Sequence, residues 1–181
     1  MEQIKELTKR LIANSFKELM LQNSFDKITI KMITDHANVI RPTFYNHFHD
    51  KYELVDWIVK EEIIEPTVTL FKENRSAEAV SNVFTGFRKD GLYYRKAFEI
   101  TGQNSFYDML LDNFSDMFRF ILESSNVSEG DELEALLPRY YASGLITTVR
   151  YMIFDAADVP VERIIDKYTS MMQHSIYDMV K

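Results

Sequence analysis

The sequence predicts an all-α protein, and two observations carry this prediction. Only 5 of the 181 residues are Gly and 4 are Pro, too few for the closely spaced turns of a β-sandwich but compatible with long helices. Apolar side chains recur every three or four residues over most of the chain, as on the buried face of a helix, and no segment shows the period-two alternation of a strand. The hydrophobic content of 46% is sufficient for a core.

The first helix is predicted to end near residues 23–24, where two turn-forming residues follow one another. Its apolar side chains share one helical face; they are Ile4, Leu7, Leu11, Ile12, Phe16, Leu19 and Met20. A second, short helix is predicted from Ile30, Ile33 and Ala37 at positions i, i+3 and i+7. Thr29 is placed to cap its start.

A third short helix is predicted after a tight turn at Asn38-Val39. Asn38 tolerates the left-handed backbone conformation that suits such a turn. Phe44 and Phe48 lie four residues apart and therefore share a face, which we expect to be buried. Pro42 falls in the first turn, where its missing N–H costs nothing. Short helices joined by a tight turn form the core of a helix-turn-helix.

The rest of the chain is predicted to form further helices behind the helix-turn-helix. The expected ranges are 51–64, ended by Glu65-Pro66; 77–90; 106–122; 132–154, with Pro138 as a kink; and 161–180, with Pro160 at its start. Residues 126–130 are expected to form a loop.

The outward face of the third helix suits the reading of DNA bases. Arg pairs with guanine edges, Asn with adenine edges, and a Thr methyl packs against thymine, so Arg41, Thr43 and Asn46 are expected to face bases. Phosphates are expected to bind at Tyr45, His47 and Lys51, and at the amide end of the helix that begins at residue 51. The full set of candidate DNA-binding residues is Thr29, Ile40, Arg41, Pro42, Thr43, Tyr45, Asn46, His47 and Lys51.

Charge is distributed unevenly along the chain. Residues 1–51 hold eight Lys or Arg and six Asp or Glu, a net charge of +2. The remainder holds 13 basic and 22 acidic residues, a net charge of −9, which gives −7 for the whole chain. A small DNA-binding head on an acidic body would show this asymmetry.

The stretch TIKMITDHANVIRPTFYNHFHDKYELVDWI, residues 29–58, resembles the DNA-binding signature of the TetR family of regulators. The matching positions are Thr29, Ile33, Ala37, Val39, the string 43–48, and Lys51-x-Glu53-Leu54. Three positions depart from the family pattern. Asn38 replaces the usual turn glycine, Ile40 replaces a capping Ser or Thr, and Pro42 replaces a small residue. Residues 40–42 are therefore expected to change the base preference.

The resemblance implies a helix-turn-helix domain over residues 1–50 and a regulatory and dimerisation domain over residues 51–181. The last two helices would form a four-helix bundle across a twofold homodimer, helped by the small side chains of Ala142, Ser143, Gly144, Thr147 and Thr148. The body is also similar to regulators of dihydroxyacetone kinase operons, through RKDGLYYRKAFEITGQNSFYDMLL and RYYASGLI. Its many aromatic residues suggest an effector pocket, with Phe84, Phe87, Phe98, Phe106, Tyr107, Tyr140, Tyr141 and Tyr151 as candidate lining residues.

The implied function is sequence-specific binding of double-stranded operator DNA, as a repressor switched by a small-molecule effector or a protein partner. The alternative is an activator controlled by a sensor protein, with no small-molecule pocket. An enzyme is not expected, because there is no Gly-rich phosphate loop, no nucleophile elbow and no Cys. No cofactor is expected, and no metal either, since His47 and His49 do not share a helical face. No apolar run approaches the roughly 18 residues of a membrane span, so a cytoplasmic protein is expected.

Overall fold

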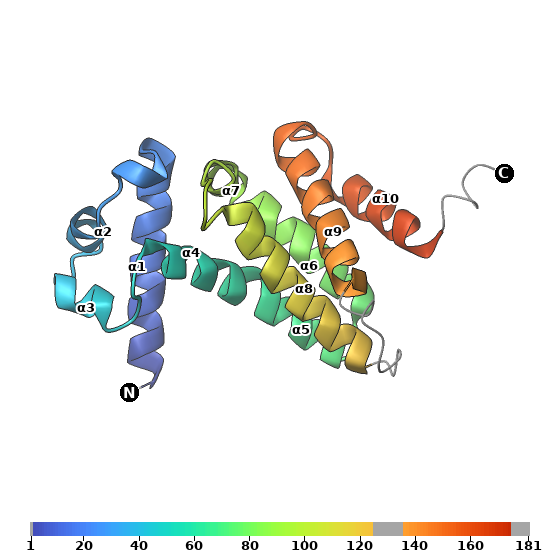
Figure 1. The fold of residues 1–181 in the computed structure, drawn as a ribbon, viewed down its shortest axis with the longest axis horizontal. Helices are drawn as coiled ribbons and strands as arrows, with labels where there is room; N and C mark the ends of the chain where they lie inside the picture. Colours follow the sequence, from blue (N-terminus) through green and yellow to red (C-terminus); the bar gives the residue numbers. More distant parts are fainter. Residues whose placement is uncertain (1, 125–135, 175–181) are drawn as a thin grey trace. The chain divides into compact units, whose positions relative to one another are not determined.

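The computed structural model describes residues 2–124 and 136–174, and every regular element within these ranges is a helix (Figure 1). The chain divides into two compact units. The first consists of the chain up to Lys60 together with Leu92–Met109, and the second of Glu61–Gly91 together with the chain from Leu110 onward. The first unit therefore extends past the boundary expected at residue 50. No helix of the described ranges has the length and apolar content needed to cross a membrane.

The first unit contains the predicted helix-turn-helix. Its elements are α1 (Glu2–Gln22), the 3-10 turn η1 (Phe25–Lys27), α2 (Ile30–His36), α3 (Arg41–Tyr45), α4 (Lys51–Val59) and most of α7 (Gly91–Ala97). The long helix α1 packs against both α2 and α4, and α2 packs against α3. The helix α7 was not predicted.

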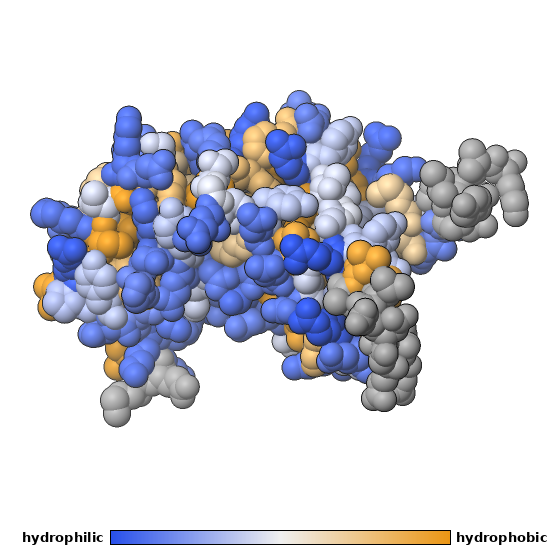
Figure 2. Space-filling view, in the orientation of Figure 1, coloured by the Kyte–Doolittle hydropathy of each residue, from blue (hydrophilic) through white to orange (hydrophobic). Residues whose placement is uncertain are grey.

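The apolar face of α1 is only partly buried. Ile12, Phe16 and Met20 are fully buried, as the periodicity predicts. In contrast, Ile4 and Leu7 are 70% and 69% exposed, so the prediction fails for the first turns of the helix. The neighbours of α1 cover the second half of its apolar face and leave the first half in solvent. In Figure 2, orange apolar side chains interrupt the mainly blue surface of this part of the chain.

The helix that starts at Lys51 does not end at Pro66, as the sequence predicted. After α4 the backbone widens into a single π-helical turn, η2 (Lys60–Ile64), and then continues as α5 (Glu65–Lys72). A proline inside a helix lacks a donor and clashes with the carbonyl four residues before it. We attribute the π turn to this clash, because the wider turn moves that carbonyl away from Pro66 while the helix continues.

The second unit is a helical bundle arranged around α6 (Ser76–Lys89). This helix packs against α5, α9 (Leu136–Phe154) and α10 (Val161–Gln173). Its buried face carries Val83, Phe84 and Phe87. The helices α6 and α8 (Phe106–Ser124) confirm the predicted ranges to within two residues. The predicted loop at 126–130, the start of the helix predicted over 132–154 and the end of the last helix lie outside the described residues.

One arginine holds the turn between the last two described helices. Arg88 of α6 donates hydrogen bonds to the carbonyls of Ala156 (3.2 Å), Val159 (3.0 Å) and Ala157. The carbonyl of Ala156 also accepts a hydrogen bond from the amide of Val159 at 3.1 Å, and the guanidinium supplies further donors to this irregular turn between α9 and α10. This arrangement fixes the direction in which α10 leaves α9.

Candidate functional site

The turn between α2 and α3 has the predicted geometry. Thr29 caps α2, because its hydroxyl oxygen accepts a hydrogen bond from the amide of Met32 at 3.2 Å. Asn38 adopts a positive φ of 51°, and the following amide, that of Val39, donates to the carbonyl of Thr34 at 3.0 Å. The asparagine therefore performs the role that a glycine has in such turns.

Two phenylalanines hold α3 against the rest of the unit. Phe44 is completely buried and Phe48 almost so, and their ring centroids lie 5.7 Å apart. The ring of Phe48 also contacts Trp57 of α4 in an edge-on arrangement at 5.7 Å. The opposite face of α3 is turned outward: Ile40, Arg41, Pro42, Tyr45 and Asn46 are exposed, and Thr43 and His47 are half-buried.

The exposed face of α3 carries one side-chain pair that is already organised. The guanidinium of Arg41 donates a hydrogen bond to the hydroxyl of Tyr45 at 3.1 Å and lies 5.5 Å from the centre of its ring. Residues four apart on a helix are neighbours on its surface, which allows this contact. The pair places a cation and a hydroxyl together at the surface of α3.

The start of α3 lacks a side-chain cap, as the sequence predicts for Ile40. Ile40 has an extended backbone conformation, and its side chain is 71% exposed instead of bonding to the helix amides. Pro42 reduces the cost, since it removes one of the amides that a cap would satisfy. The three departures at residues 38, 40 and 42 are therefore compatible with an intact turn and helix.

Two of the amides at the start of α4, where the sequence led us to expect a phosphate, already have a partner within the chain. The side chain of Asp50 accepts hydrogen bonds from the amides of Tyr52 (2.8 Å) and Glu53 (2.9 Å). Glu53 in turn accepts a hydrogen bond from the amide of His49. This capping satisfies two of the orphan amides of the helix and places a negative charge where a phosphate was expected.

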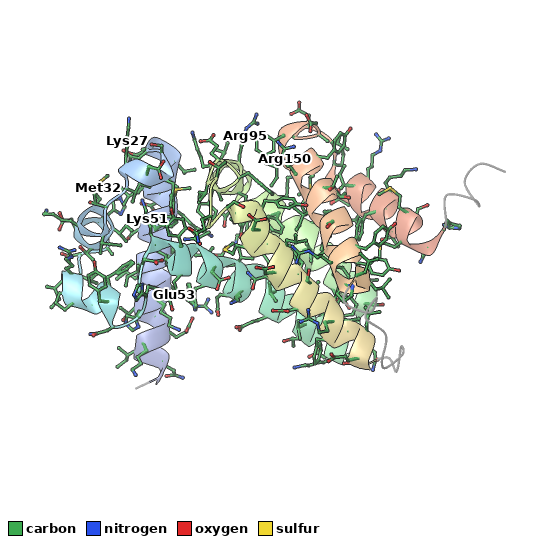
Figure 3. All side chains as sticks on the ribbon, in the orientation of Figure 1. Lys27, Met32, Lys51, Glu53, Arg95 and Arg150 are labelled. Carbon is green, nitrogen blue, oxygen red and sulfur yellow. The ribbon has the colours of Figure 1, made fainter. Side chains whose placement is uncertain are left out.

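Lys51, which the sequence led us to expect as a phosphate anchor, has contacts within the chain. Its ammonium donates hydrogen bonds to the carbonyls of Phe25 (2.6 Å) and Ile28 (3.1 Å) and lies 4.1 Å from the centre of the Phe25 ring. Burial lowers the pKa of Lys51, and the charge of Asp26 opposes this shift. Figure 3 shows Lys51 near the start of α4. The contacts favour a structural role, in which Lys51 ties α4 to the turn after α1.

The change Lys51→Met is expected to lower the free energy of unfolding by about 1–2 kcal/mol, because two carbonyls lose a charged donor. Urea denaturation followed by the fluorescence of Trp57, the single Trp of the chain, measures this change. The salt dependence of DNA binding should keep its slope. Lys51→Arg, which retains the charge and the donors, is the control. A slope reduced by about one with unchanged stability would instead identify a phosphate contact.

His47 lies two residues after the end of α3 and is half-buried. Burial lowers its pKa, and the charges of Lys9 and Lys5 lower it further, against an opposing contribution from Glu6. The imidazole is therefore neutral at neutral pH, and one ring nitrogen can accept while the other donates. No group of three or more acidic or histidine side chains within the described ranges could hold a metal ion.

The aromatic residues proposed to line an effector pocket do not come together. Phe98 and Phe106 contact each other in the first unit, with ring centroids 5.0 Å apart. Phe84 and Phe87 are fully buried in the core of the second unit. The hydroxyl-bearing residues Tyr107, Tyr140 and Tyr151 are exposed.

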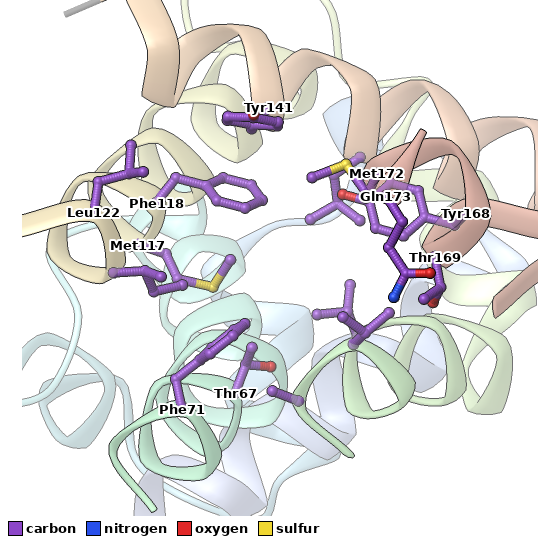
Figure 4. Close-up of a pocket in the computed structure, with 15 residues that line it drawn as sticks. Thr67, Phe71, Met117, Phe118, Leu122, Tyr141, Tyr168, Thr169, Met172 and Gln173 are labelled. Atoms are coloured by element: carbon purple, nitrogen blue, oxygen red, sulfur yellow. The ribbon is translucent and has the colours of Figure 1, made fainter. Parts of the chain in front are cut away.

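A cavity of about 340 Å³ does lie within the second unit, and of the eight proposed residues only Tyr141 lines it (Figure 4). Its walls come from α5, α6, α8, α9 and α10. The lining residues that sequence reasoning missed are mostly aliphatic or sulfur-containing, such as Val80, Met117 and Met172. Helical periodicity marks such residues as inward-facing, but it does not distinguish a cavity wall from a packed core.

The first unit thus presents a short helix whose buried face is fixed by two phenylalanines and whose outer face carries Arg41, Tyr45 and Asn46. A helix-turn-helix with such a face defines a DNA-binding regulator. Comparison with known proteins agrees. Residues 17–58 match the model of bacterial regulatory proteins of the tetR family, and residues 74–174 match a transcriptional regulator C-terminal region. The chain belongs to the TetR family of transcriptional regulators.

Similar proteins of known sequence and structure are also regulators. The HTH-type dhaKLM operon transcriptional activator DhaS of Lactococcus lactis subsp. lactis is 27% identical over 153 residues, which span 81% of this chain and 80% of the relative. The solved structure of a dihydroxyacetone kinase operon activator DhaS matches with a TM-score of 0.63 at 22% identity, covering 92% of this chain and 96% of that one. A TetR-family regulator from Syntrophomonas wolfei str. Goettingen matches with a TM-score of 0.66 at 15% identity, covering 93% and 94%.

Proposed function

We propose that this regulator acts in the cytoplasm as a homodimer on a palindromic operator, with each α3 in the major groove. The single observation that carries this proposal is the outward face of α3, held in place by the burial of Phe44 and Phe48. Two such helices about 34 Å apart would read half-sites one turn of DNA apart. Arg41 and Asn46 would then contact bases, and Tyr45 a phosphate.

The outer face of α9 supports the proposal of a homodimer. Leu136 and Tyr140 are 62% and 68% exposed, and Tyr151 is 54% exposed further along the same face. Gly144 lies between them, and a side chain built there would meet nothing within 4 Å in its own chain. An apolar stripe interrupted by a small residue allows a second helix to approach closely.

The hydroxyl groups of α9 do not oppose such a contact. Ser143 donates to the carbonyl of Arg139, Thr147 to that of Ser143, and Thr148 to that of Gly144, each at 2.8 or 2.9 Å. Hydroxyls bonded back to the preceding turn need no further partner. They can therefore be buried between two copies of the chain at little cost.

The cavity of the second unit supports control of DNA binding by a small-molecule effector. A ligand that binds one state of the dimer better than the other shifts the equilibrium between DNA-bound and free protein. Control by a sensor protein is the alternative, and it would not depend on occupation of the cavity.

Repression is the first hypothesis for the sign of regulation. Activation is the second, and it is favoured by the similarity to the Lactococcus relative, which is an operon transcriptional activator.

The experiment that tests the proposal is selection of genomic fragments by the purified protein at two salt concentrations. A recovered palindrome, bound less tightly at higher salt, is the expected result, because phosphate contacts release counterions. Transcription in vitro from the adjacent promoter would then assign repression or activation. Failure to enrich any sequence over random DNA would contradict the proposal.

The change Arg41→Ala is expected to alter base preference in this selection, with a loss of about 1–3 kcal/mol of discrimination at one position of the site. Lys31→Ala is the matched control, because it removes the same charge from α2, where Lys31 is paired with Asp35. The control should weaken binding to all sequences alike. An unchanged preference in Arg41→Ala would show that another residue reads the bases.

A further inference from the structure

The cavity in the second unit has walls without charge. None of the 15 residues that line it carries an ionisable acidic or basic group other than the phenols of Tyr141 and Tyr168. Most of the wall is aliphatic, aromatic or thioether surface, including Phe71, Phe118 and Leu145. A carboxylate, phosphate or ammonium group buried here would lose its hydration and find no opposite charge.

The polar groups of the cavity are few, and one of them, the hydroxyl of Thr67, is already hydrogen-bonded within the protein. The hydroxyl of Thr67 donates to the carbonyl of Ile63 at 2.6 Å and accepts from the side-chain Nδ2 of Asn82 at 2.9 Å. It is fully buried in this pair of hydrogen bonds. Thr67 therefore ties α5 to α6 and offers little to a ligand.

The polar groups that remain come mainly from α10. Thr169 and Gln173 lie on this helix, and Tyr141 lies on the wall formed by α9 (Figure 4). Tyr168 also lines the cavity, with its ring packed edge-on against Phe84 at 5.1 Å. Burial raises the pKa of Tyr168 to about 12, with a smaller contribution from Tyr141. Its phenol therefore stays neutral at physiological pH.

We propose that this cavity binds an uncharged ligand with a mainly hydrocarbon body and one or two hydrogen-bonding groups directed toward α10. The proposal rests on the proposed function of an effector-controlled regulator. The volume of about 340 Å³ is at the lower end of the range for small-molecule sites. Met117 and Met172 give the wall adaptable surface for such a body. A small polyhydroxylated molecule would leave most of its hydroxyls unpaired.

The test is calorimetric titration of the full chain with three probes: decan-1-ol, decanoate and dihydroxyacetone. The expected result is that decan-1-ol binds at least tenfold more tightly than decanoate. Dihydroxyacetone should not bind; it is included because the similar structure is that of a dihydroxyacetone kinase operon activator. Equal or tighter binding of decanoate would overturn the proposal. Absence of binding by decan-1-ol would overturn it as well.

Two variants locate the binding. Val80→Trp should abolish binding of decan-1-ol, because Val80 is half-buried in the cavity wall and a larger ring would fill the space. Val68→Trp, at a half-buried position of α5 that does not line the cavity, should leave it unchanged. Decan-1-ol binding that survives in Val80→Trp would overturn the assignment to this cavity. Binding as expected, but without effect on operator affinity, would support the ligand class and contradict only the proposed effector control.

Discussion

Replacement of Phe44 by alanine is expected to unfold the helix-turn-helix and abolish DNA binding. Phe44 is fully excluded from solvent and contacts the ring of Phe48, which in turn contacts Trp57. Truncation of a buried phenylalanine costs about 3–5 kcal/mol, a large part of the roughly 5–15 kcal/mol that stabilises a typical domain. Urea denaturation followed by Trp57 fluorescence should show the loss, because Trp57 lies in the same unit.

Tyr45→Ala is the matched control for this change. Tyr45 follows Phe44 in α3 and is also aromatic, but it is 48% exposed. Its replacement should change the unfolding midpoint little and should still weaken DNA binding, through loss of a contact instead of loss of the fold. A wild-type midpoint in Phe44→Ala would show that α3 is not held by its buried face.

Replacement of Gly144 by arginine is expected to dissociate the proposed homodimer. Within one chain the new side chain meets nothing within 4 Å of its Cβ, so the fold of the protomer should be retained. Across a twofold axis the same change would place two long cations in the contact between two α9 helices. Sedimentation should then show monomers at concentrations where the unchanged protein is dimeric. Affinity for a two-half-site operator should fall by about 100-fold or more, since the gain from bivalent binding is lost.

Thr85→Arg provides the comparison on another helix. Thr85 is exposed on α6. The substitution therefore adds the same charge away from the exposed apolar face of α9 and should leave the dimer intact. Binding of a single half-site should be similar in both variants, because α3 is unchanged. A Gly144→Arg protein that remains dimeric with full operator affinity would exclude the face of α9 as the dimer contact.

Much of the DNA-binding site could be predicted from the sequence because its signals are local. The cap at Thr29, the left-handed turn at Asn38 and the inward pair Phe44 and Phe48 each depend on residues no more than a few positions apart. Backbone sterics and helical periodicity act over this same range. The missing cap at Ile40 could be predicted for the same reason.

Other features depend on contacts between residues far apart in the sequence. The ammonium of Lys51 binds carbonyls 23 and 26 residues away, and the sequence does not indicate whether a lysine points toward solvent or into the chain. The exposure of Ile4 and Leu7 depends on how far the neighbouring helices reach along α1. The π turn before Pro66 shows that a helix can continue past a proline when its geometry adjusts.

The all-helical fold, the turn at Asn38 and the division of α3 into a buried and an outward face all follow from the amino-acid sequence, because helical period and turn chemistry depend on neighbouring residues. Which aromatic side chains fill the core and which reach solvent depends on the packing of the helices, as does the cavity among five helices, of whose expected lining only Tyr141 is present. The position of the cavity depends on how whole helices pack. Packing is the sum of many weak contacts between residues far apart in the sequence, so it cannot be predicted from any single segment.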